Sequence, residues 1–102
     1  MNVRDVAASF QAAVVDTLVE KTIRAAVENN VHRIVVAGGV AANSSLRKRM
    51  NEEAAKGGMT LYLPGMFFCI DNAAMIALAG YLHFKRGETS SLDLNPRPSM
   101  PL

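Results

Sequence analysis

The chain has 102 residues, of which 50% are hydrophobic, and its formal net charge is +2. This length supports one modest hydrophobic core, and so small a charge does not by itself indicate nucleic-acid binding. The single cysteine, Cys69, excludes an internal disulfide and fits a reducing compartment. Residues 1–20 lack the pattern of a signal peptide, and no apolar run approaches the roughly 20 residues of a membrane span. We therefore expect a soluble, cytoplasmic chain.

Residues 1–30 predict one long helix. Asn2 can cap its start, with Asp5 three residues later at the capping-box position. Asn29 and Asn30 predict its end, because asparagine tolerates the left-handed conformation that often follows a helix. Apolar side chains recur every four residues and predict one buried stripe: Phe10, Val14 and Leu18.

Two short strands are predicted. The first covers residues 33–37, and the second covers residues 60–63 and is ended by Pro64 and Gly65. The first strand has a continuous apolar run at its centre, which is typical of a strand covered on both faces. That run consists of Ile34, Val35 and Val36.

Two further helices complete the pattern. The second helix begins near Asn43 or Ser44 and ends at the glycines of residues 57–58. The third opens at Asp71 and ends at Gly87. Each has apolar residues at helical spacing: Leu46, Met50 and Ala54 in the second, and Ala74, Met75, Leu78 and Leu82 in the third.

The predicted order is helix, strand, helix, strand, helix, which defines an α/β fold. A strand–helix–strand succession implies parallel pairing through a right-handed crossover. We divide the chain into a body, residues 1–87, and a polar tail, residues 88–102, whose prolines prevent a helix. Two strands make a poor sheet on their own, so we expect this chain to be part of a larger structure.

The segment from Arg33 to Leu46, RIVVAGGVAANSSL, predicts a nucleotide site. Gly38 and Gly39 remove the Cβ atoms that would block a phosphate or ribose from the backbone, and the next helix offers N–H groups and a positive dipole end. Ligands of parallel sheets bind beyond the carboxyl ends of the strands. The pattern therefore brings Asn43 and Asp71 toward the same edge of the sheet.

Several of these residues also have simpler interpretations. Asn43 and Asp71 are both good helix caps, and a bare glycine pair is a common turn. Cys69 is best interpreted as a small buried hydrophobe, and His32 and His83 as residues at element ends without a metal role. The basic clusters at residues 47–49 and 85–86 are interpreted as solvated helix faces, with contact of Arg47 and Lys48 to a nucleic-acid phosphate as the alternative.

Four blocks of the chain carry a family resemblance, and they occur in the family's order. They are residues 5–11 (DVAASFQ), 35–43 (VVAGGVAAN), 71–77 (DNAAMIA) and 97–102 (RPSMPL). They closely resemble the C-terminal part of the universal tRNA N6-adenosine threonylcarbamoyltransferase family, once described as O-sialoglycoprotein endopeptidases. We therefore expect the chain to represent the C-terminal portion of such a protein.

The resemblance implies a lobe of the actin-like ATPase (ribonuclease H-like) fold. It also implies transfer of a threonylcarbamoyl group from threonylcarbamoyl-adenylate to N6 of the adenosine 3′ of a tRNA anticodon. By the same resemblance, Gly38, Gly39 and Asn43 would hold the adenylate, and Asp71 would be one ligand of a divalent metal, iron or alternatively zinc. No catalytic residue is assigned.

The family's other metal ligands form a His-x-x-x-His pair, which this chain lacks. We therefore expect the chain alone to bind no metal and to be inactive. Partner proteins of a tRNA-modification complex are implied for the full-length protein. We expect apolar surface on the first helix and the sheet edge, and from it self-association of the chain. The alternatives are a non-catalytic assembly partner, or another actin-like carbamoyltransferase or kinase.

Overall fold

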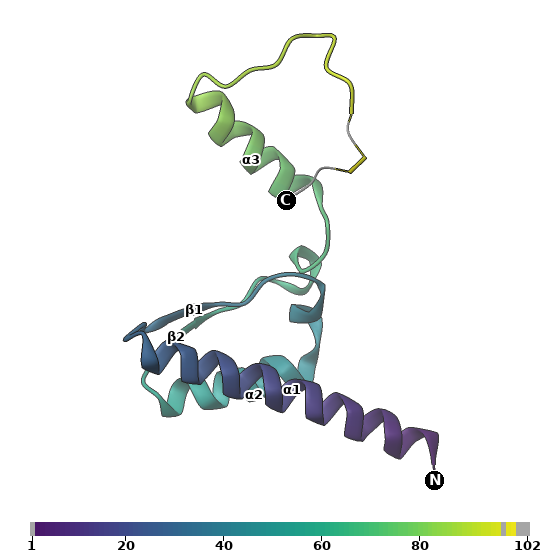
Figure 1. Cartoon of the computed structure of the whole chain (residues 1–102), viewed down its shortest axis with the longest axis vertical. Coiled ribbons are helices and arrows are strands. Elements are labelled where there is room, and N and C mark those ends of the chain that lie inside the picture. The colour runs from purple at the N-terminus through teal and green to yellow at the C-terminus, as the bar shows by residue number, and fades with distance from the viewer. Residues whose placement is uncertain (1, 97, 100–102) are drawn as a thin grey trace. The chain divides into compact units, whose positions relative to one another are not determined.

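The computed structural model describes residues 2–96 and 98–99 (Figure 1). The chain divides into two compact units, Met1–Ile70 and Asp71–Leu102, and each is described by itself. The helices and strands follow the predicted order: α1 (Val3–Glu28), β1 (Arg33–Val35), α2 (Ser44–Lys56), β2 (Thr60–Tyr62) and α3 (Ala73–Lys85). The α/β prediction is thus confirmed. Two 3₁₀ turns that the sequence did not predict are η1 (Gly39–Ala42) and η2 (Met66–Phe68).

Both predicted ends of α1 are confirmed. The side chain of Asn2 accepts a hydrogen bond from the Arg4 N–H at 3.1 Å. At the other end Asn30 has φ +53, in the left-handed region, and the Val31 N–H donates to the Ala26 carbonyl at 2.8 Å. The Asn2 side chain and the left-handed turn at Asn30 therefore help to satisfy backbone groups that a helix leaves without partners.

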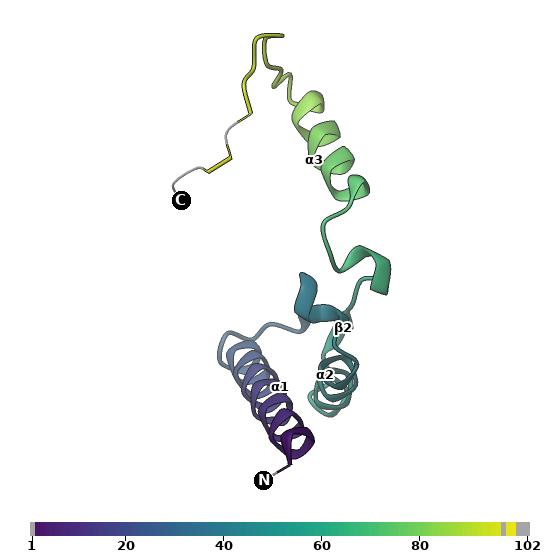
Figure 2. The same ribbon diagram turned by 90° about the vertical axis from the view of Figure 1, so that its right-hand side faces the viewer.

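The sheet is a parallel pair, as predicted. Ile34 of β1 faces Leu61 of β2 in the register, with Arg33 beside Thr60 and Val35 beside Tyr62. Helix α2 connects the two strands, and α1 and α2 lie side by side next to the sheet (Figure 2). This arrangement places the glycine turn after β1 and the loop after β2 at the same edge of the sheet.

The core of the first unit lies between α1 and α2. Its buried members are Val15, Val19, Leu46 and Met50, with Ile23, Val36 and Leu61 packed partly against them. The predicted stripe of α1 is wrong: Phe10 is 71% exposed, Val14 37% and Leu18 40%. The helix contacts α2 through the adjacent stripe, so the apolar repeat faces an open groove instead of the core.

The prediction that β1 is covered on both faces is also wrong. Ile34 is 6% exposed, whereas Val35 is 73% exposed and its neighbour Tyr62 is 52% exposed. Alternation along a strand explains this difference, because successive side chains point to opposite faces and the helices cover one of them. In the first unit, the other face of the sheet is therefore apolar and open.

Helix α2 matches its prediction closely. Asn43 caps its start, and its buried residues are Leu46, Met50 and Ala54. At its end Gly58 has φ +64 and the Met59 N–H returns to the Ala54 carbonyl at 2.8 Å. Glycine is favoured at residue 58, because most other residues are strained in this conformation.

The second unit contains α3, which begins later than predicted. Its N-cap is Asn72, whose side chain accepts from the Met75 N–H at 3.1 Å, so the simpler interpretation of Asp71 as the cap is wrong. The described part of α3 has no buried residue. The helix ends before Gly87, at φ +75, as predicted.

The tail shows no helix or strand over its described residues, 88–96 and 98–99. Part of the family-like ending, namely residues 97 and 100–102, lies outside the described residues. The division into a body and a tail stays a prediction. No helix in the described chain combines the length and the apolar character that a membrane crossing requires.

Candidate functional site

The glycine turn follows β1 directly and is open. Gly38 has φ +90, a conformation that favours glycine, while Gly39 has no such constraint. A Cβ atom built on either residue would meet no other atom of residues 2–96 and 98–99 within 4 Å. The backbone of this turn therefore presents a free surface at the carboxyl edge of the sheet, as the sequence predicted.

The turn leads into α2 through η1, a single 3₁₀ turn. The Ala41 N–H donates to the Gly38 carbonyl and the Asn43 N–H to the Val40 carbonyl, both at 3.0 Å. These bonds bring Asn43 to the start of α2. There its Oδ1 accepts from the Leu46 N–H at 3.0 Å, so its role as a helix cap is confirmed.

The amide of Asn43 is oriented from a second helix. Its Nδ2 donates to Oε1 of Gln11 on α1 at 3.1 Å, and Gln11 Nε2 donates to the Ser45 hydroxyl at 3.2 Å. Gln11 ends the first family-like block and Asn43 ends the second, and the fold brings them together. The sequence pattern did not predict this role of Gln11, although its position in that block was the available signal.

Asn43 also lies at the end of an apolar groove along α1, which we call the α1 groove. It encloses about 220 Å³. Its lining consists of Phe10, Gln11, Val14, Val15, Leu18, Val40, Asn43 and Leu46. The stripe that was expected in the core therefore lines a surface beside the glycine turn.

Arg47 links the glycine turn to the loop after β2. Its Nε donates to the Ala41 carbonyl at 2.6 Å, and one terminal nitrogen donates to the Pro64 carbonyl and lies 3.2 Å from Cys69 Sγ. Arg47 is half-buried, so its interpretation as part of a solvated face is wrong. Its guanidinium has protein partners on both loops, through Nε and one terminal nitrogen.

Cys69 is buried, as predicted, with 3% of its surface exposed. Its thiol donates weakly to the Gly65 carbonyl at 3.6 Å and accepts from Arg47. His32 precedes β1, where its carbonyl accepts from the Thr60 N–H, and His83 lies in the last turn of α3 beside Glu88. Both histidines are at element ends, as predicted.

Asp71, the predicted metal ligand, opens the second unit and is exposed. Among residues 2–96 and 98–99, no three His, Cys, Asp or Glu side chains form a group that could hold a metal. A catalytic centre usually needs about three protein ligands. The donors described here therefore do not fit a complete metal centre, and Asp71 supplies at most one ligand.

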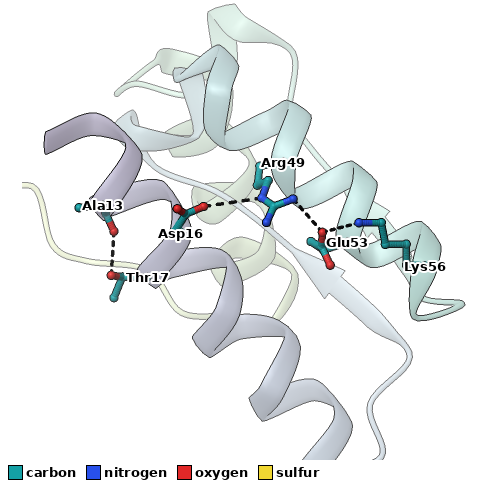
Figure 3. Close-up of polar contacts among 6 residues, drawn as sticks. All are labelled: Ala13, Asp16, Thr17, Arg49, Glu53 and Lys56. Atoms are coloured by element: carbon teal, nitrogen blue, oxygen red, sulfur yellow. Dashed lines mark hydrogen bonds and ion pairs between the residues drawn. The ribbon is translucent and has the colours of Figure 1, made fainter. Parts of the chain in front are cut away.

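A charged cluster lies away from the turn, where α1 and α2 face each other (Figure 3). Arg49 contacts Asp16 at 3.6 Å and Glu53 at 2.9 Å, and Lys56 contacts Glu53 at 2.8 Å. The hydrogen bond from Lys56, with the nearby charges of Lys56 and Arg49, holds the pKa of Glu53 below its usual value. Arg49 thus joins two helices, and this cluster has a structural function.

The chain is therefore an α/β protein with an open glycine turn at the carboxyl edge of a parallel sheet. The family model for tRNA N6-adenosine threonylcarbamoyltransferase matches residues 1–78. The chain belongs to this family.

Relatives with that name show how much of the family the chain represents. It is 52% identical over 100 residues to the protein of Caldicellulosiruptor saccharolyticus, covering 98% of this chain and 30% of the relative. It is 54% identical over 101 residues to that of Syntrophotalea carbinolica, covering 99% of this chain and 30% of the relative. The chain is 50% identical over 99 residues to the Thermodesulfovibrio yellowstonii protein, covering 97% of this chain and 29% of the relative. The chain thus spans about 30% of the length of these relatives.

Proposed function

We propose that this chain supplies one part of a tRNA N6-adenosine threonylcarbamoyltransferase. The complete enzyme transfers the threonylcarbamoyl group of threonylcarbamoyl-adenylate to N6 of the adenosine 3′ of the anticodon. The observation that carries the proposal is the family match over residues 1–78, which includes the glycine turn, Asn43 and Asp71. Its substrates are then tRNA and the adenylate donor, and its setting is the cytoplasm.

The glycine turn receives the adenylate part of the donor. Gly39 supports this role, because a Cβ there would meet open space and the packing of the chain gives no reason for a glycine. Asn43 offers a second hydrogen on Nδ2, since one hydrogen donates to Gln11 and an amide nitrogen carries two. The positive end of α2 adds an attraction for phosphate.

Asp71 serves as one ligand of a divalent metal, iron or alternatively zinc. Its carboxylate is not used as the cap of α3, because Asn72 has that role. A bound metal would act as a Lewis acid on the carbamoyl carbonyl of the donor. The remaining ligands belong to parts of the family that this chain does not contain, so the chain alone binds no metal and does not turn over.

The test uses a chimera in which this chain replaces the matched segment of the Caldicellulosiruptor saccharolyticus relative. Purified chimera receives threonylcarbamoyl-adenylate, tRNA and iron, and digested tRNA is analysed for modified adenosine by mass spectrometry. We expect modification by the chimera and none by the isolated chain. Asp71→Asn and Gly39→Ala should each lower kcat/KM at least about tenfold, which corresponds to about 1.4 kcal/mol.

Glu52→Gln is the matched control, because this residue is exposed on α2 and lies outside the glycine turn. The activity of a variant is compared with that of the unchanged chimera only where the two have equal thermal stability, so that misfolding is not mistaken for a loss of catalysis. A folded chimera that leaves tRNA unmodified would contradict the proposal. Turnover by the isolated chain would contradict the claim that the other lobe is essential.

A further inference from the structure

Arg47 makes contacts on both loops that leave the carboxyl edge of the sheet. Ala41, which accepts from Nε at 2.6 Å, belongs to the segment after β1. Pro64 and Cys69, which contact the terminal nitrogen, lie on either side of η2 in the segment after β2. One guanidinium therefore fixes the two segments relative to each other, and both lie in the first unit.

The chemistry of these contacts suits arginine in particular. A guanidinium presents its N–H donors in a rigid plane, so bonds to two carbonyls in different directions define a geometry. Arg47 is half-buried, and its charge strengthens each hydrogen bond relative to a neutral donor. Lysine at this position would keep the charge but present it at a single point, and could not hold both segments in the same way.

We propose that Arg47 is a positioning residue for the donor site. It sets the spacing between the glycine turn, which receives the adenylate, and the loop that leads through Cys69 to Asp71. Since Asp71 follows Cys69 closely along the chain, movement of this loop changes where the metal-ligand segment starts. This inference rests on the proposed function and adds to it a physical link between nucleotide binding and the metal-ligand segment.

The rate at which the Cys69 thiol is alkylated measures that link directly. Cys69 is the only cysteine of the chain and is 3% exposed, so it reacts with a thiol reagent only when the loop opens. We expect Arg47→Gln to speed alkylation of Cys69 at least about tenfold in the isolated chain, which corresponds to about 1.4 kcal/mol in the opening equilibrium. Arg47→Lys should give an intermediate rate.

Two controls separate a local effect from general destabilisation. Arg24→Gln makes the same chemical change on α1, where the exposed guanidinium forms salt bridges with Glu20 and Glu28. Val19→Ala weakens the core without touching either loop. The proposal is overturned if Cys69 is alkylated no faster in Arg47→Gln than in Arg24→Gln. It is also overturned if Cys69 is alkylated no faster in Arg47→Gln than in Val19→Ala when both are compared at equal global stability.

The second measurement tests the link to nucleotide binding in the chimera. Adenosine monophosphate is the probe, its binding is measured by calorimetry, and alkylation of Cys69 is followed by mass spectrometry of its peptide. We expect the nucleotide to slow alkylation severalfold in the unchanged chimera and to have no effect after Arg47→Gln. Activity should fall mainly through kcat, with partial rescue by Arg47→Lys.

The outcomes distinguish this inference from the function on which it rests. Absence of nucleotide binding by the unchanged, folded chimera would count against the adenylate role of the glycine turn. Binding with equal protection of Cys69 in both proteins would overturn the inference about Arg47 alone. A loss of activity in Arg47→Gln that appears only in KM would also overturn the inference about Arg47. The spacing between the turn and the metal-ligand loop should act on the chemical step, and therefore on kcat.

Discussion

Leu46 and Leu18 form a matched pair that tests where α1 meets the rest of the first unit. Leu46 is 4% exposed and belongs to the core with Val15, Val19 and Met50. Leu18 is 40% exposed and lines the α1 groove. Sequence periodicity places both leucines in the core, whereas the structure buries Leu46 and leaves Leu18 partly exposed.

The expected magnitudes follow from burial. Leucine to alanine removes three carbon atoms, worth about 0.8 kcal/mol each when fully buried, or about 2.4 kcal/mol for Leu46. The cavity left in a close-packed core raises this loss to about 3–4 kcal/mol. For Leu18 only about 60% of that transfer term applies, and the open groove leaves no cavity, so we expect about 1.4 kcal/mol.

The measurement is urea unfolding of Leu46→Ala and Leu18→Ala, followed by circular dichroism and extrapolated to zero denaturant. Leu78→Ala on α3 gives a reference in the second unit, because Leu78 is 60% exposed and the same transfer term predicts a loss of about 1 kcal/mol. We expect Leu46→Ala to lose about 2 kcal/mol more than Leu18→Ala. Equal losses, or a larger loss for Leu18→Ala, would refute the assignment of the core and restore the periodic stripe.

Three further predictions concern other parts of the chain. Asn43→Ala should lower the free energy of unfolding by about 1 kcal/mol because the cap of α2 is lost, whereas Asn43→Asp should keep the cap. Thermal unfolding of both variants measures this difference, and equal losses of stability would argue against the capping bond. The pKa of Glu53 is lowered in the folded state, so its stabilising effect is present above its unfolded value of 4.5 and is lost as the pH falls through the folded pKa. The stability difference between the unchanged chain and Glu53→Gln should therefore shrink as the pH falls below 4.5, and a constant difference would contradict the role of Lys56. The exposed Phe10, Val35 and Ile76 should drive self-association, measured by sedimentation; a monodisperse monomer at high concentration would exclude it.

Local signals allowed the elements and their ends to be predicted from the sequence. Asn2, Asn43 and Gly58 each perform a backbone task that depends on a few neighbouring residues, and all three were assigned correctly. The buried side of α2 was also predictable, because its polar positions leave a single apolar stripe: Leu46, Met50 and Ala54. Parallel pairing followed from the order of the elements.

The misplaced stripe of α1 has a physical cause: periodicity shows an apolar face but does not identify what that face packs against. Helix α1 has apolar residues on more than one side, and Val15 and Val19 contact α2 while Phe10 stays exposed. The contacts of Arg47 were equally inaccessible, since Ala41, Pro64 and Cys69 come together only through the strand pairing. Asn72 was missed as a cap because Asp71, its neighbour, is an equally good cap by residue type.

The two interpretations of Asn43 turn out to use different atoms. Its Oδ1 is committed to the Leu46 N–H, while Nδ2 donates to Gln11 and keeps a second hydrogen. A helix cap and a ligand contact can therefore coexist in one side chain, and the contact with Gln11 holds the amide in a fixed orientation. Aspartate in its place would keep the capping oxygen and lose both Nδ2 donors. Asn43→Asp therefore separates the cap from the amide: stability is retained through the cap, and a loss of nucleotide affinity then belongs to the lost Nδ2 donors and the added negative charge.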